Sequence, residues 1–175
     1  MDFNVDHFAL FGLPKKFRTD PDLLDKRYRE MQVLAHPDRY AGAGDAEKRV
    51  SMQWATRVNE AYQTLKNPLR RAAYLMLLAG KKLDVESNTA MPTEFLIEQM
   101  EWREAVAEAR RACANTELEQ FYHRVKQQMK CRYERLASLL DDKADTALAE
   151  DEVLRLMFLD KLVSEIDDAL VALEA

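Results

Sequence analysis

The sequence Ala35-His36-Pro37-Asp38-Arg39-Tyr40 separates two long stretches of helical periodicity and determines how the chain must turn. We predict one helix from Asp20 to Ala35 and another from roughly Asp45 to Leu65. Pro37 has no N–H to donate, and its ring disfavours the α conformation for the preceding His36, so the first helix must end here. The imidazole and the carboxylate of this stretch are therefore expected on a loop at the tip of a helical hairpin.

The composition favours an all-α protein, built as one domain or as two small ones. The chain has 175 residues with only four Gly and five Pro, and either arrangement is large enough to bury a core. Its net charge of −5 argues against a nucleic-acid partner. Residues 1–80 carry 13 Lys and Arg against 10 Asp and Glu, whereas residues 81–175 carry 13 against 21. Two units with different partners would produce such a division, although charge alone does not establish it.

Metal-binding and membrane-spanning patterns are absent from the sequence. Cys113 and Cys131 form no CxxC pair, and the three scattered histidines do not complete a ligand set, so we expect buried or free thiols, no metal and no cofactor. The acidic residues 1–6 match neither a signal peptide nor an Arg-rich transit peptide. No apolar run is long enough for a bilayer. We therefore expect a soluble cytoplasmic protein of a bacterium, without a membrane partner.

The predicted helix after Asp20 has two chemically different faces. Asp20 is a suitable N-cap and Pro21 suits the first helical position. An apolar stripe is expected on one side, made by Leu24, Tyr28, Met31 and Ala35. The other side and its flank carry the cations of Lys26, Arg27 and Arg29. From the pattern alone this could simply be a solvated charged face, and a docking surface for an acidic partner is the alternative.

Two further helices are predicted around this hairpin in the first half, and its second helix has its own apolar stripe. His7 to Pro14 contains a short apolar helix that Gly12 and Pro14 end. The helix after the loop has a stripe at Val50, Trp54, Val58, Ala61 and Leu65. Asn67-Pro68 then caps and opens a helix from Leu69 to Ala79, which Gly80 ends.

With these flanking helices, His36-Pro37-Asp38 resembles the signature of the J-domain, the co-chaperone module that stimulates DnaK-type chaperone ATPases. The segment from Asn67 to Tyr74 resembles the one that closes such a domain. The resemblance implies a chaperone-binding surface, made by His36, Pro37, Asp38, Lys26, Arg27, Arg29 and Arg39. Arg39-Tyr40 stands where many J-domains carry Lys and an apolar aromatic residue, so the charge and the ring are kept.

The second half is predicted to be an antiparallel three-helix bundle after a connection at residues 81–91. One helix spans about Thr93 to Ala112. Thr116-Glu117-Leu118-Glu119 has the pattern of a capping box and is expected to open the second helix. A polar turn around Asp141–Asp145 precedes a last helix from about Thr146 to Leu173.

The first helix of this bundle has apolar residues on two opposite sides. Phe95, Trp102, Val106 and Ala109 make its expected core face. The opposite side presents Leu96, Ile97 and Met100, edged by Glu101 and Glu104. A bundle helix needs only one buried face. Either neighbouring helices also cover this second side, or it is an exposed docking site for a partner.

Two motifs make the resemblance more specific. Phe95-Leu96-x-Glu98-Gln99-x-x-x-Arg103-Glu104 and Arg155-x-x-Phe158-Leu159-Asp160-Lys161-Leu162 look like the C-terminal domain of the HscB family of J-proteins in iron–sulfur cluster assembly. Residues 8–14 look like the same family. The resemblance implies that the chain brings an IscU-type scaffold protein to an HscA-type chaperone ATPase. The implied scaffold surface comprises Leu96, Ile97, Met100, Glu101, Glu104 and Phe158.

Other classes of function fit the sequence less well. An enzyme would have to use His36 and Asp38 without a nearby nucleophile, phosphate loop or metal set. A general J-protein would be expected to carry a Gly/Phe-rich linker or a zinc ribbon, and a purely structural bundle would not need the loop. We therefore predict a non-enzymatic co-chaperone, with a J-domain at residues 1–80 and a scaffold-binding three-helix domain at residues 92–175.

Overall fold

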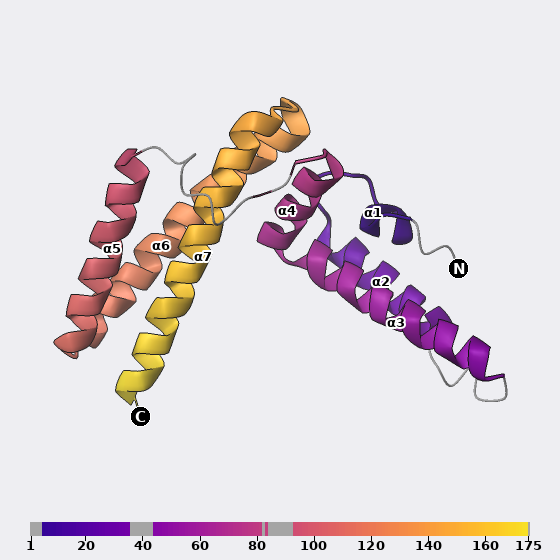
Figure 1. The fold of residues 1–175 in the computed structure, drawn as a ribbon, viewed down its shortest axis with the longest axis horizontal. Coiled ribbons are helices and arrows are strands. Elements are labelled where there is room, and N and C mark those ends of the chain that lie inside the picture. Colours follow the sequence, from indigo (N-terminus) through magenta and orange to yellow (C-terminus); the bar gives the residue numbers. More distant parts are fainter. Residues whose placement is uncertain (1–4, 36–43, 82, 84–92, 175) are drawn as a thin grey trace. The chain divides into compact units, whose positions relative to one another are not determined.

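The computed structural model describes residues 5–35, 44–81, 83 and 93–174, and helices are the only regular elements within them (Figure 1). The all-α prediction is therefore confirmed. The chain divides into two compact units, Met1–Gly80 and Lys81–Ala175, and each is described by itself. Among the described helices none is both long enough and apolar enough to cross a bilayer.

The first unit contains α1 (His7–Leu10), α2 (Pro21–Ala35), α3 (Asp45–Lys66) and α4 (Pro68–Leu78). Both predicted N-caps are confirmed. Asp20 Oδ1 accepts hydrogen bonds from the N–H groups of Asp22 at 3.0 Å and Leu23 at 3.2 Å, and Asn67 Oδ1 accepts one from Arg70 at 3.0 Å. These caps satisfy donors that the first turn of a helix leaves unpaired, so they fix where α2 and α4 begin.

Aromatic contacts hold α2 against α3 in the first unit. The rings of Tyr28 and Tyr62 stack with centroids 3.8 Å apart. The Tyr62 hydroxyl donates to Asp25 at 2.8 Å, and the Tyr28 hydroxyl donates to Asn59 at 2.9 Å. Below this layer lies a continuous apolar core, made by Phe8, Phe11, Leu13, Leu24, Trp54, Val58, Ala61 and Leu65. Each helix of the hairpin thus buries one stripe, as amphipathic helices require.

The predicted core position of Val50 is wrong. Val50 is 42 % exposed, and Ser51 is buried in its place. Advancing 100° per residue from Val58 puts Ser51 about 20° from the core direction and Val50 about 80° away. Two consecutive steps of four residues rotate a stripe off the buried face, whereas alternating steps of three and four keep it there.

The N-terminal segment packs against α3 and α4 of the first unit. The His7 ring stacks on Tyr74 with centroids 4.2 Å apart, and the His7 N–H donates to the Tyr74 hydroxyl at 3.0 Å. Arg57 donates to the Val5 carbonyl at 2.7 Å. Burial, together with the nearby Arg57 charge, lowers the pKa of His7, so its imidazole stays neutral in this contact.

The second unit is a three-helix domain of α5 (Thr93–Arg111), α6 (Asn115–Ala137) and α7 (Thr146–Glu174), with a π-helical turn η3 (Ser138–Asp142) extending α6 (Figure 1). Its core lies between the facing stripes of these helices. The fully buried side chains include Leu118, Val125, Leu136, Val153, Leu156, Leu162 and Ile166.

The predicted capping box at Thr116 is wrong. The helix α6 already begins at Asn115, and its N-cap Ala114 offers no side-chain hydrogen bond. Cys113 ends α5 in the left-handed conformation with φ 52°, and the Ala114 N–H donates to the Ala109 carbonyl at 2.9 Å. This is the geometry of a Schellman motif. Ala114, the last residue of this motif, is also the N-cap of α6. Thr116 therefore falls inside the first turn of α6 and cannot cap it.

The predicted polar turn at Asp141–Asp145 is shorter than expected. The Lys143 N–H donates to the Ser138 carbonyl at 3.1 Å, so η3 continues the helix to Asp142. Ala144 then reverses the chain with φ 52°, and Asp145 caps α7 by accepting from the Leu148 N–H at 3.0 Å.

A buried carboxylate links α6 to α7. Glu152 is 2 % exposed and meets Arg132 at 3.0 Å and Arg135 at 3.3 Å, one arginine on each carboxylate oxygen. The Arg132 side chain is itself largely buried. Two cations therefore compensate a charge that would otherwise be costly to remove from water.

Replacing Glu152 with Ala should destabilise the second unit by about 3–5 kcal/mol, because Arg132 would remain buried without its counter-charge. Urea unfolding followed by circular dichroism measures this loss. Glu150→Ala is the matched control, since Glu150 pairs with Lys81 at 3.1 Å in a more exposed setting and should cost less than about 1 kcal/mol. Equal small losses in both variants would show that the buried cluster is not stabilising.

Candidate functional site

The predicted loop residues His36, Pro37, Asp38 and Arg39 lie outside the described residues. The helix that leads to them is described as far as Ala35. Its cations Lys26, Arg27 and Arg29 are all exposed. Arg27 is paired with Glu30 at 3.2 Å, one turn further along the helix. We name Lys26, Arg27 and Arg29 the basic face of α2.

The packing of Tyr28 explains why the basic face of α2 points outward. Its ring is stacked on Tyr62 of α3, so Lys26, about 200° away around the helix, lies on the far side, and Arg27 and Arg29, about 100° to either side, lie on the exposed flanks. Near the end of α2, Val33 and Leu34 are also exposed, although both are apolar. Neither residue was predicted to belong to a surface, although both lie off the stripe of Leu24 and Met31, which was the available signal.

The second predicted surface lies on α5. Met100 is 72 % exposed and Ile97 is 51 % exposed, whereas Leu96 is half-buried. Glu101 and Glu104 are exposed beside them. We name Leu96, Ile97, Met100, Glu101 and Glu104 the outer face of α5. Within the described second unit, neighbouring helices do not cover this apolar side.

The inner face of α5 is occupied by its own domain. Phe95, Val106 and Ala109 are buried against the other helices, as the sequence predicts. Phe158 of α7 lies at the same contact and is half-buried. Its ring meets Phe95 edge-on with centroids 5.8 Å apart. The structure thus brings five of the six predicted residues together on one helix face and places Phe158 on the flank of that face.

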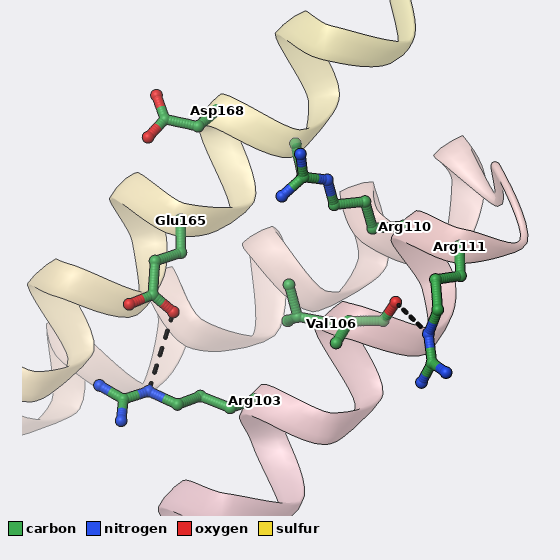
Figure 2. A pocket seen from close by; sticks show the side chains of 8 residues that line it. Arg103, Val106, Arg110, Arg111, Glu165 and Asp168 are labelled. Atoms are coloured by element: carbon green, nitrogen blue, oxygen red, sulfur yellow. Dashed lines mark hydrogen bonds and ion pairs between the residues drawn. The ribbon is translucent and has the colours of Figure 1, made fainter.

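A charged groove of about 600 Å³ separates the C-terminal half of α5 from α7 (Figure 2). Arg103, Arg110 and Arg111 line its α5 wall, and Glu165 and Asp168 line the α7 wall. Arg103 Nε lies 3.8 Å from Glu165 Oε2 across it. The groove has no nucleophile or histidine in its lining. The two carboxylates balance two of the three arginines, which leaves the lining with one net positive charge.

Within the described residues, no group of three or more His, Cys, Asp or Glu side chains could hold a metal ion. Cys113 and Cys131 are free and exposed. The two surfaces that remain are a cationic one on α2 and an apolar, acid-edged one on α5. Both have the chemistry of protein contacts.

Comparisons with protein families divide the chain where its folding units divide. Residues 6–74 match the DnaJ domain, and residues 91–167 match the HSCB C-terminal oligomerisation domain. The co-chaperone protein HscB homolog of Aromatoleum aromaticum is 51 % identical over 174 residues, covering 99 % of this chain and 98 % of that protein. The homolog from Azoarcus sp. (strain BH72) is 52 % identical with the same coverage.

Solved structures give the same result for the fold. The chaperone HscB from Vibrio cholerae superposes with a TM-score of 0.85 at 35 % identity, covering 97 % of this chain and 99 % of that one. The human co-chaperone protein HscB superposes with a TM-score of 0.89 at 30 % identity, covering 95 % of this chain and 83 % of that one.

Met100→Ala should change the free energy of unfolding by no more than about 0.5 kcal/mol, because a side chain this exposed has little packing to lose. Phe95→Ala, five residues earlier on the buried side of α5, should cost about 3–5 kcal/mol. Urea unfolding of both variants makes the comparison. A Met100→Ala loss as large as that of Phe95→Ala would mean that the outer face of α5 is packed.

Proposed function

This chain belongs to the HscB family of J-domain co-chaperones, and we propose that it binds an IscU-type iron–sulfur scaffold protein, delivers it to an HscA-type chaperone ATPase and stimulates ATP hydrolysis there. The observation that carries the proposal is that one chain combines two dissimilar contact surfaces. The basic face of α2 lies in the DnaJ-type unit, and the outer face of α5 lies in the HSCB-type unit. A delivery protein needs two such surfaces.

The family assignment makes the chain a regulator of a partner's ATPase rather than an enzyme. We propose that His36, Pro37 and Asp38 bind at the nucleotide domain and linker of the chaperone and favour its hydrolysis-competent state. The basic face of α2, with Arg39, would steer and orient this encounter. Charges at the rim of an interface act more on the association rate than on affinity.

The outer face of α5 is proposed as the scaffold-binding surface, with Phe158 on its flank. Exposed apolar side chains such as Ile97 and Met100 release water when a partner covers them, and this supplies most of the binding free energy. The surrounding carboxylates of Glu101 and Glu104 would select a partner with complementary charge. A scaffold held there would be at raised effective concentration beside the chaperone.

We propose a J-domain over residues 1–80, a connection over 81–91 and a scaffold-binding domain over 92–175. The division into compact units after Gly80 supports these boundaries. We also propose that the protein works in the bacterial cytoplasm, because relatives with about 50 % sequence identity are bacterial co-chaperones.

Asp38→Asn and His36→Gln should each abolish stimulation of the chaperone ATPase while leaving helicity and melting temperature nearly unchanged. The reason is that a polar pair on a connecting loop contributes contacts to a partner rather than to a core. Steady-state ATP hydrolysis by the chaperone, with scaffold present, provides the measurement. Unfolding of either variant would instead assign the loop a structural role and weaken the co-chaperone proposal.

Leu96→Ala combined with Met100→Ala should weaken scaffold binding severely while the fold remains intact. Apolar anchors at the centre of an interface often contribute about 2 kcal/mol or more each, which is roughly thirtyfold in affinity per residue. Calorimetric titration with the scaffold measures the loss.

Leu148→Ala is the matched control for this double variant. Leu148 is an exposed leucine near the start of α7, ten residues or about 15 Å along the helix from Phe158. Its truncation should leave the affinity unchanged. Normal scaffold binding by the double variant would show that the outer face of α5 is not the docking site.

A further inference from the structure

Five side chains form a continuous series of contacts between α5 and α7. The Arg155 guanidinium lies over the Phe95 ring at 4.6 Å from its centroid. Phe95 meets Phe158 edge-on at 5.8 Å between centroids, and the Arg103 guanidinium lies 5.2 Å from the Phe158 centroid. Arg103 in turn reaches Glu165 at 3.8 Å. Successive members come alternately from α7 and α5, so the series ties the two helices together.

Phe158 is held on two sides within this series. Phe95 fixes one edge of its ring from the buried side of α5, and the Arg103 cation covers it from further along the same helix. A cation over an aromatic ring is attracted by the negative face of that ring. Figure 2 shows Arg103 extended from α5 toward Glu165 on α7, with the ion pair that orients its guanidinium.

Arg103 also borders the outer face of α5. Advancing 100° per residue from Phe95 puts Arg103 at about 80°, Leu96 at about 100° and Met100 at about 140°. Arg103 therefore lies between the flank that holds Phe158 and the exposed apolar residues. Its contact with the half-buried Phe158 ring therefore lies at the border of the outer face of α5.

We propose that Arg103 is a positioning residue that holds Phe158 in the orientation required for scaffold binding, and that Glu165 assists by orienting Arg103. The inference rests on the proposed function. Arg103 acts through the Phe158 ring and not as a direct partner of the scaffold. Pre-arranging a contact side chain strengthens binding by lowering the entropy that is lost when the complex forms.

The expected effect is modest, because both members of the contact are partly exposed. Removing the cation with Arg103→Gln should weaken scaffold binding about two- to fivefold, which is the range for a cation–π contact at such a site. Arg103→Lys keeps a cation of similar reach, so it should lose no more than half as much binding free energy for the scaffold as Arg103→Gln. The exposed ion pair contributes less, so Glu165→Gln should weaken binding no more than about twofold.

The deciding experiment is a double-mutant cycle with Phe158→Leu, measured by calorimetric titration with an IscU-type scaffold from the same bacterium. If Arg103 acts through Phe158, Arg103→Gln must weaken binding in the unmodified chain and have no further effect in the Phe158→Leu background. A loss of equal size in both backgrounds would overturn the inference, because Arg103 would then act independently of the ring.

Arg110→Gln is the matched control. Arg110 lines the same groove on the same helix, about 10 Å further along α5, and its replacement removes the same charge. It should leave the scaffold affinity unchanged, and a loss equal to that of Arg103→Gln would show a general charge effect and overturn the inference. Urea unfolding of each variant verifies that the second unit remains folded.

The outcomes separate this inference from the proposed function. If the unmodified chain does not bind the scaffold, the proposed function fails and the inference fails with it. If the unmodified chain binds normally and Arg103→Gln binds equally well, only the inference fails.

Discussion

A helix in a three-helix domain can bury only one of its faces, and α5 carries apolar side chains on two. The other helices of the unit cover Phe95, Val106 and Ala109, which leaves Ile97 and Met100 in water. Leaving two large apolar side chains exposed gives up the transfer free energy that their burial would supply, about 1.5–3 kcal/mol for each fully buried residue. A partner that covered the outer face of α5 would recover this free energy as binding.

In the first unit α2 also buries one face, but its exposed side is cationic where that of α5 is apolar. Its hairpin buries Leu24 and stacks Tyr28 on Tyr62, and the exposed side of α2 carries the three cations Lys26, Arg27 and Arg29. Residues 1–80 hold an excess of positive charge and residues 81–175 an excess of negative charge. The two proposed contact surfaces would therefore differ in their main driving force, which is charge on α2 and apolar area on α5. Partners suited to one surface would bind the other poorly.

Local signals predicted most of the fold correctly, because caps and apolar periods act within one helix. Asp20 and Asn67 marked helix starts that the structure confirms, and the all-α class followed from the same periods. The wrong predictions for Val50 and for the start of α6 came from local geometry, whereas the burial of Glu152 was not predicted because tertiary contacts determine it. Glu152 is buried although it is charged, and an apolar period cannot predict such a position. Its negative charge is compensated by two arginines from α6. Because Cys113 adopts the left-handed conformation, α6 begins earlier than predicted. A glycine at this position would have indicated the turn, but the residue is a cysteine. For the candidate site, periodicity indicated which residues share a face of α5, but the contact between Arg103 and Phe158 depends on how α7 lies beside α5.

The different driving forces have a consequence for the order of events that we propose. Charge attraction extends over about 8 Å at physiological salt and accelerates encounters, whereas apolar contacts act only at contact distance and mainly slow dissociation. A surface of three exposed cations therefore suits a brief encounter with a chaperone, and an apolar patch on α5 suits a longer hold on a scaffold. A delivery protein requires this asymmetry, because it must keep its cargo while it finds the chaperone and then leave the chaperone quickly. The division of the chain into two compact units lets each contact have its own lifetime, since neither surface shares a core with the other.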